Sequence, residues 1–143
     1  MEENVDITYW IERAKQIATL AHEGQKRNSG SPYIEHPIRV ASKVEDRLKP
    51  IALLHDVVED TLITLKDLED LKFPSYILDA VDLLTHKKGD TNVTYWNKIM
   101  TNPDAINVKL RDIEDNLASI PSVYARSKYA KALDLFKKAG YSL

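Results

Sequence analysis

Apolar residues recur at the spacing of an α-helix along most of this chain, and this feature restricts its fold more than any other. The clearest stretch runs from Trp10 to Ala21, where apolar residues follow the i, i+3, i+4 pattern of an amphipathic helix. Glycine and proline together make up about 7% of the 143 residues, against about 12% on average. No stretch alternates with the period of a β-strand. We therefore predict an all-α fold, a single compact helical bundle over residues 1–143.

Further helical segments follow along the chain. Thr64 to Asp67 form a capping box that predicts the start of a short helix, and Gly140 is placed to end the last one. Residues 24–36 (GQKRNSGSPYIEH) form a long polar loop after the first helix, and loops of this length in small domains are often functional. The other predicted helices cover residues 38–48, 51–60, 75–85, 95–100, 105–117 and 129–136.

The composition excludes several classes of site and partner. The chain has no cysteine, so any metal must be held by histidines and carboxylates. Its 20 basic and 22 acidic residues give a net charge of −2, which provides no overall field for nucleic acid or an anionic membrane. No run of about 18 apolar residues exists, and MEENVDITYW lacks the order of a signal peptide. We expect a cytoplasmic protein that binds neither nucleic acid nor membrane, and we leave homo-oligomer formation open.

The segment Ile51–Asp60 (IALLHDVVED) carries the strongest chemical signal. If it is one helix, His55, Asp56, Glu59 and Asp60 form a continuous polar strip and apolar residues cover the remaining surface. Burying three carboxylates without a nearby cation is unfavourable. A divalent metal ion would supply the missing charge, and imidazole with carboxylate suits a first-row ion. The alternative is that the strip simply faces water.

Two other segments offer ligands of the same kind. His36 precedes Pro37 at a junction between loop and helix, where its side chain can point inward or remain at the surface. Asp112 shares a predicted helix face with Lys109 and Asn116, and this face either contributes to a site or is solvated. Lys109 either neutralises Asp112 or lies outside the site.

The order His36, His55-Asp56, Asp112 resembles the signature of the HD phosphohydrolase superfamily. The chain further resembles the hydrolase domain of RelA/SpoT-type alarmone enzymes, and the stand-alone small alarmone hydrolases in particular. This resemblance extends over most of the chain. It rests on three segments: GQKRNSGSPYIEHP (24–37), LLHDVVEDT (53–61) and VKLRDIEDN (108–116).

The resemblance implies one divalent ion per chain, usually Mn²⁺ although another divalent metal is an alternative, held by the four residues of this signature. It implies that Glu59 and Asp60 position or deprotonate the attacking water. The alternative is that they only orient His55 or His36 without proton transfer. It places Arg27 on the nucleotide base, with Ser29 in the same motif, and Asn116 facing the nucleoside.

Other positions around these motifs have two interpretations. Asn28 departs from the family, where this position is often basic. Tyr33 is a packing residue or a ligand contact. The basic cluster His86–Lys88 either caps the preceding helix or contacts a second diphosphate.

The function that this resemblance implies is metal-dependent hydrolysis of guanosine 3′,5′-bis(diphosphate), or ppGpp, by activated water. The products would be GDP and pyrophosphate, and the biological setting would be the stringent response. One alternative is a nucleotidase or phosphohydrolase of the same superfamily that acts on another nucleotide, including adenosine-type alarmones. A second alternative is a non-catalytic module that binds an alarmone.

Overall fold

The first helix of the computed structural model, α1 (Ile7–Ala21), follows the amphipathic pattern of the sequence. The structure describes residues 6–119 and 123–143, so part of the N-terminal segment used for the targeting prediction lies outside the described residues. The side chain of Asp6 accepts a hydrogen bond from the Thr8 backbone and caps the helix. Trp10 and Ala14 are buried on one face, as their spacing predicts.

The next two predicted helices are each divided. Residues 38–48 were expected to form one helix, but α2 (Glu35–Ala41) is followed by a 3₁₀ helix (Asp46–Leu48). Likewise the expected helix over 51–60 is divided into α3 (Lys49–Leu54) and α4 (Val57–Asp60). This second division interrupts the helical hydrogen-bonding pattern at His55 and Asp56, so the prediction of one continuous polar strip was wrong.

The remaining helices agree with the predicted segments. α5 (Leu65–Asp70) begins at the expected capping box, in which Thr64 and Asp67 exchange hydrogen bonds between side chain and backbone. Gly140 follows the last helix with a φ of +95°, a conformation that glycine adopts readily. The four helices between these points are α6 (Ser75–Leu84), α7 (Asn92–Ile99), α8 (Pro103–Ser119) and α9 (Val123–Lys138).

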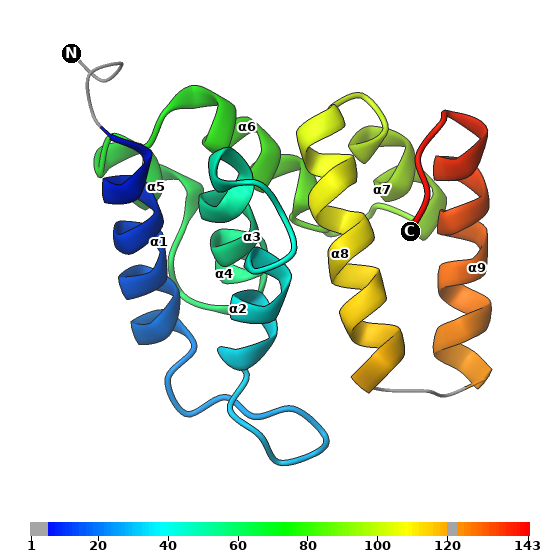
Figure 1. Cartoon of the computed structure of the whole chain (residues 1–143), viewed down its shortest axis with the longest axis horizontal. Helices are drawn as coiled ribbons and strands as arrows, with labels where there is room; N and C mark the ends of the chain where they lie inside the picture. The colour runs from blue at the N-terminus through cyan, green and yellow to red at the C-terminus, as the bar shows by residue number, and fades with distance from the viewer. Residues whose placement is uncertain (1–5, 120–122) are drawn as a thin grey trace.

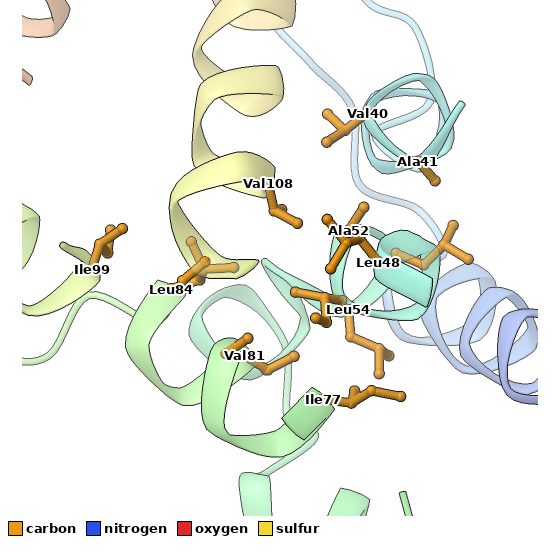
Figure 2. Close-up of a cluster of buried hydrophobic side chains, with 14 of the residues drawn as sticks. Val40, Ala41, Leu48, Ala52, Leu54, Ile77, Val81, Leu84, Ile99 and Val108 are labelled. Atoms are coloured by element: carbon orange, nitrogen blue, oxygen red, sulfur yellow. The ribbon is translucent and has the colours of Figure 1, made fainter. Parts of the chain in front are cut away.

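Helix α3 is the centre of the bundle. α1, α2, α6 and α8 all pack against it. Figure 2 shows Ala52 and Leu54 of α3 between side chains of these helices, including Val81 and Val108. Leu54 and Val81 are fully buried. Burying an aliphatic side chain of this size contributes about 1.5–3 kcal/mol, so this cluster fixes α2, α3 and α8 relative to one another.

The elements that carry the predicted metal ligands, α2, the end of α3 and α8, are neighbours in the bundle. In Figure 1, α2 and α3 lie between α1 and α8, and the loop over residues 22–34 projects beyond the ends of α1 and α2. α8 and α9 lie side by side, and α7 packs against α8. Among the described residues, no helix combines the length and apolar character needed to cross a membrane.

Candidate functional site

His36, His55, Asp56 and Asp112 come together in the structure. They belong to α2, to the junction of α3 and α4, and to α8. Each offers one ligand atom, and these four atoms lie within 4.8 Å of one another. Asp56 is partly exposed, and the other three residues are buried. Residues that are distant in the sequence therefore form one compact cluster of two imidazoles and two carboxylates.

The division between α3 and α4 brings His55 and Asp56 to the same point. Consecutive side chains on a continuous helix are about 100° apart, so they would diverge. Here Asp56 has a φ of −108° and a ψ of −1°, which turns the chain between the two helices. As a result, His55 Nε2 lies 2.9 Å from Asp56 Oδ2.

A hydrogen bond at Nδ1 orients each histidine. His55 Nδ1 lies 2.5 Å from the carbonyl oxygen of Ala52, and this oxygen can only accept. His36 Nδ1 lies 2.6 Å from Asp115 Oδ2, and its Nε2 lies 2.8 Å from Asp112 Oδ1. Nε2 of both rings therefore faces the cluster, which is the usual arrangement of histidines that bind metal through one nitrogen.

The donor set fits a divalent cation. His55 Nε2 is buried and makes no hydrogen bond within the described part of the chain, although carboxylate oxygens of Asp56 and Asp112 lie 2.9 and 3.4 Å away. A nitrogen lone pair that points between two carboxylates is suited to sharing a cation with them. Two carboxylates would neutralise a dication, and neutral imidazoles complete a set that suits a first-row metal.

The electrostatics of the cluster favour positive charge. Burial alone would lower the pKa of His55, but Asp56 and Asp112 raise it well above its usual value. Burial alone would raise the pKa of Asp56, but His55 lowers it to about 2. Without a metal ion the carboxylates therefore stabilise a proton on the imidazole, and a divalent cation would take the place of that proton.

Lys109 lies inside the site and neutralises Asp112, which decides a question that the sequence left open. Its Nζ atom is 2.9 Å from Asp112 Oδ2 and 5.3 Å from the centre of the Tyr95 ring. Burial opposes ionisation of Asp112, but Lys109 and the neighbouring histidines hold its pKa well below the usual range. One carboxylate oxygen of Asp112 thus faces Lys109 and the other faces His36.

Residues that follow α1 hold the cluster and α4 in place. The hydroxyl of Tyr33 donates a hydrogen bond to Asp56, and its ring packs against His22 with 4.9 Å between centroids. Gln25 accepts from His22 Nδ1 at 2.8 Å and donates to the backbone carbonyl of Asp60 at 2.9 Å. The loop therefore fixes both Asp56 and the end of α4.

A cavity of about 370 Å³ opens beside the cluster. Glu59 and Asp60 line it, and Glu59 Oε1 accepts a hydrogen bond of 2.6 Å from the backbone of His86. Burial, followed by the charges of Asp56 and Glu59, raises the pKa of Asp60 to about 6. The opposite wall comes from α7, α8 and α9 and includes Tyr95, Trp96, Lys109, Asn116, Lys128 and Tyr129.

The predicted substrate-binding residues differ in position. Asn116 lines the cavity, whereas Arg27 and Ser29 do not belong to its wall. Arg27 has a side chain only 6% exposed, and its Nη2 donates to Asn116 Oδ1 at 3.0 Å. Ser29 lies in the exposed part of the loop and pairs with Ser31. Lys87 donates to the Asp82 carbonyl at the end of α6, as the helix-capping interpretation predicts, whereas His86 of the same cluster lines the cavity.

Sequence reasoning overlooked two residues that hold parts of the site in place, Asp115 and Gln25. Asp115 binds His36, and Gln25 connects α1 to α4. Asp115 follows Asp112 by three residues on a helix, and this spacing places the two side chains on neighbouring parts of one face. The spacing alone could have indicated Asp115, whereas nothing in the sequence indicates the partner of Gln25.

The chain is similar in sequence to bacterial ppGpp enzymes. It is 47% identical over 66 residues to the bifunctional (p)ppGpp synthase/hydrolase SpoT of Escherichia coli strain K12. The matched segment covers 43% of this chain and 9% of that protein. It is 45% identical over 71 residues to the guanosine-3′,5′-bis(diphosphate) 3′-pyrophosphohydrolase of Vibrio cholerae, covering 46% and 10%. A probable GTP pyrophosphokinase of Mycobacterium leprae is 32% identical over 124 residues, or 77% of this chain and 16% of that one. The chain thus spans only a small part of each of these curated relatives. No family model matches it.

The fold has a counterpart among solved structures. A metazoan ortholog of SpoT that hydrolyses ppGpp superimposes with a TM-score of 0.71 and 26% identity, over 87% of this chain and 84% of the other. The chain is therefore similar in both sequence and fold to the RelA/SpoT-type hydrolases. This confirms the all-α fold and the resemblance that the three motifs predicted.

Proposed function

We propose that this chain is a metal-dependent pyrophosphohydrolase that converts ppGpp to GDP and pyrophosphate, a reaction of the stringent response. The observation that carries the proposal is the cluster of two histidines and two aspartates within 4.8 Å, beside a cavity that Glu59 and Asp60 line. The names of the relatives support ppGpp as the substrate.

His36, His55, Asp56 and Asp112 would hold one divalent ion, and we propose Mn²⁺. A divalent cation in such a site acts as a Lewis acid on phosphate and makes water a stronger acid. The protein's own contribution is orientation. The α3–α4 turn, the Ala52 carbonyl and Asp115 fix the ligand atoms before any ion arrives, so little ordering remains for binding to accomplish.

Glu59 and Asp60 are the proposed proton acceptors. In the reaction, the oxygen of water forms a bond to the phosphorus that is attached to the 3′ oxygen. The bond between this phosphorus and the 3′ oxygen breaks. A carboxylate takes the proton from water, and the departing 3′ oxygen gains a proton. The His86 backbone holds one oxygen of Glu59, and Gln25 holds the backbone of Asp60, so both side chains stay at the cavity wall.

The cavity wall supports binding of a phosphorylated nucleotide. Lys109 and Lys128 supply positive charge for phosphate, and Tyr95 and Tyr129 supply aromatic faces. Asn116 is the predicted nucleoside contact that reaches this wall. The proposed roles of Arg27 and Ser29 would require the loop to approach the nucleotide, and Arg27 would then release Asn116.

The decisive experiment is product analysis with purified protein. Metal-stripped protein receives Mn²⁺ and ppGpp, and chromatography should show GDP and pyrophosphate in equal amounts. Asp56→Asn should abolish turnover because a ligand is lost. If ppGpp remains intact at protein concentrations near those of the substrate, the proposal is refuted. Binding of ppGpp without turnover would instead identify a non-catalytic module.

A panel of nucleotides tests the substrate. ppGpp should be preferred over its adenosine counterpart and over nucleoside monophosphates. A preference of tenfold or more for a monophosphate would identify a nucleotidase and contradict the proposal. Titration with Mn²⁺, Mg²⁺ and Zn²⁺ in the same assay tests the proposed metal.

Glu59→Gln separates proton transfer from metal binding. It should lower the turnover number by about 10²- to 10⁴-fold, which is the usual contribution of a positioned acid or base. Mn²⁺ affinity should stay close to that of the wild type, since Glu59 is outside the four-residue cluster. An unchanged turnover number would exclude Glu59 as the proton acceptor.

A further inference from the structure

Asp115 is a buried carboxylate that binds a proposed metal ligand without belonging to the four-residue cluster. It lies three residues after Asp112 on α8 and is only 3% exposed. Its Oδ2 atom is 2.6 Å from Nδ1 of His36. Nε2 of the same ring is 2.8 Å from Asp112 Oδ1 and therefore faces the cluster.

Two arginines complete the surroundings of this carboxylate. Arg39 of α2 donates from Nε to Asp115 Oδ1 at 2.8 Å and from Nη2 to Oδ2 at 3.1 Å. Arg27 of the loop places Nη1 at 3.7 Å from Oδ2. The polar groups described around Asp115, from His36, Arg39 and Arg27, are thus hydrogen-bond donors or positive charges. Such surroundings suit a carboxylate, which has two acceptor oxygens.

We propose that Asp115 is a positioning residue that holds His36 in the tautomer and orientation needed to bind a metal ion through Nε2. This inference rests on the proposed metal site. A carboxylate that accepts from Nδ1–H leaves the lone pair on Nε2, and partners of this kind commonly tune metal affinity. Arg39 stabilises the negative charge of Asp115, so the carboxylate remains an acceptor for His36.

Because its partners are donors, Asp115 can be tested with the variant Asp115→Asn. Asparagine replaces one acceptor oxygen with an NH₂ donor. Arg39 cannot accept a hydrogen bond, so its two donors should keep the amide oxygen. The NH₂ group then faces His36 Nδ1, which becomes an acceptor only if the ring proton moves to Nε2. In that tautomer Nε2 has no lone pair for a metal ion.

The matched control lies on the same helix. Asp104 also forms a two-bond ion pair with an arginine, Arg47. It contacts neither histidine of the cluster and lines a different cavity. Asp104→Asn therefore removes a carboxylate from an arginine pair on α8 while leaving the proposed metal ligands unchanged.

The experiment measures Mn²⁺ affinity by electron paramagnetic resonance titration, with circular dichroism to verify folding. Asp115→Asn should weaken Mn²⁺ binding by about 10- to 100-fold, whereas Asp104→Asn should match the wild type. Equal affinity of Asp115→Asn and wild type would overturn the inference and leave the metal site intact. Failure of the wild type to bind Mn²⁺ would overturn the proposed function itself.

A second measurement needs no variant and applies even if Asp115→Asn fails to fold. Long-range ¹H–¹⁵N spectra of the wild type loaded with Zn²⁺, a diamagnetic divalent ion, report the tautomer of His36. The proton should reside on Nδ1, with Nε2 unprotonated. A His36 ring with its proton on Nε2 would overturn the inference.

Discussion

Replacing Lys109 with methionine should destabilise the metal-free protein, and added divalent cation should reduce this loss. Lys109 lies 2.9 Å from Asp112, and their side chains are only 12% and 5% exposed. Methionine keeps most of the length and volume of lysine but removes the charge. Asp112 would then remain buried beside Asp56 with less positive charge around it.

The size of the effect follows from this burial. Removing one partner of a buried ion pair costs about 3–5 kcal/mol, because the other charge stays out of water without compensation. For a chain of this length, the corresponding fall in Tm is roughly 6–20 °C. A divalent cation bound by Asp112 would restore positive charge, so the difference between variant and wild type should narrow in saturating Mn²⁺.

Thermal unfolding, followed by circular dichroism with chelator and with Mn²⁺, provides the assay. Lys66→Met is the control, since Lys66 also pairs with an aspartate on its own helix but at an exposed site. It should change Tm little under either condition. The reasoning is refuted if Lys109→Met lowers Tm no more than Lys66→Met, or if Mn²⁺ leaves the difference between Lys109→Met and wild type unchanged.

Three further predictions concern the core, the loop and pH. Ile113→Ala removes a fully buried side chain of α8 and should lower the free energy of unfolding in urea by about 2–5 kcal/mol; a loss below that range would contradict the packing described. Tyr33→Phe removes the hydrogen bond to Asp56 and should weaken Mn²⁺ binding by about 10-fold or more in a calorimetric titration; unchanged affinity would exclude this role. In the metal-free protein, burial and the neighbouring carboxylates raise the pKa of Asp60 to about 6, so its contribution to stability is present at low pH and is lost as the pH rises through that value. Asp60→Asn should therefore raise the free energy of unfolding in urea of the metal-free protein at about pH 7 but not at about pH 4. An equal change in this free energy at the two pH values would contradict the raised pKa of Asp60.

The helical fold was predictable because its cause is repeated along the chain. Amphipathic spacing appears in nearly every helix, and Thr64 and Asp67 form the capping box that their spacing predicts. The turn at His55 and Asp56 was not predictable in the same way. The segment 51–60 contains neither glycine nor proline, so local preferences favour one helix. Tertiary contacts lie on both sides of the turn: α3 is buried in the bundle, and Gln25 binds the backbone of Asp60 at the end of α4.

The site was predictable only in part, for a related reason. Spacing on a helix gives the direction of a side chain around its own axis, and this placed Asp112, Lys109 and Asn116 on one face. It does not give the element that packs against that face. The contact of Asp115 with His36 depends on α2 and α8 being neighbours, and the contact of Arg27 with Asn116 depends on the path of the loop.

The most direct test of the account is the position of the metal itself. A crystal of the protein soaked in Mn²⁺ should show one strong anomalous peak per chain, bound by His36, His55, Asp56 and Asp112. An anomalous peak that lies elsewhere, for example between Glu59 and Asp60, would contradict the account, as would the absence of any peak at saturating Mn²⁺.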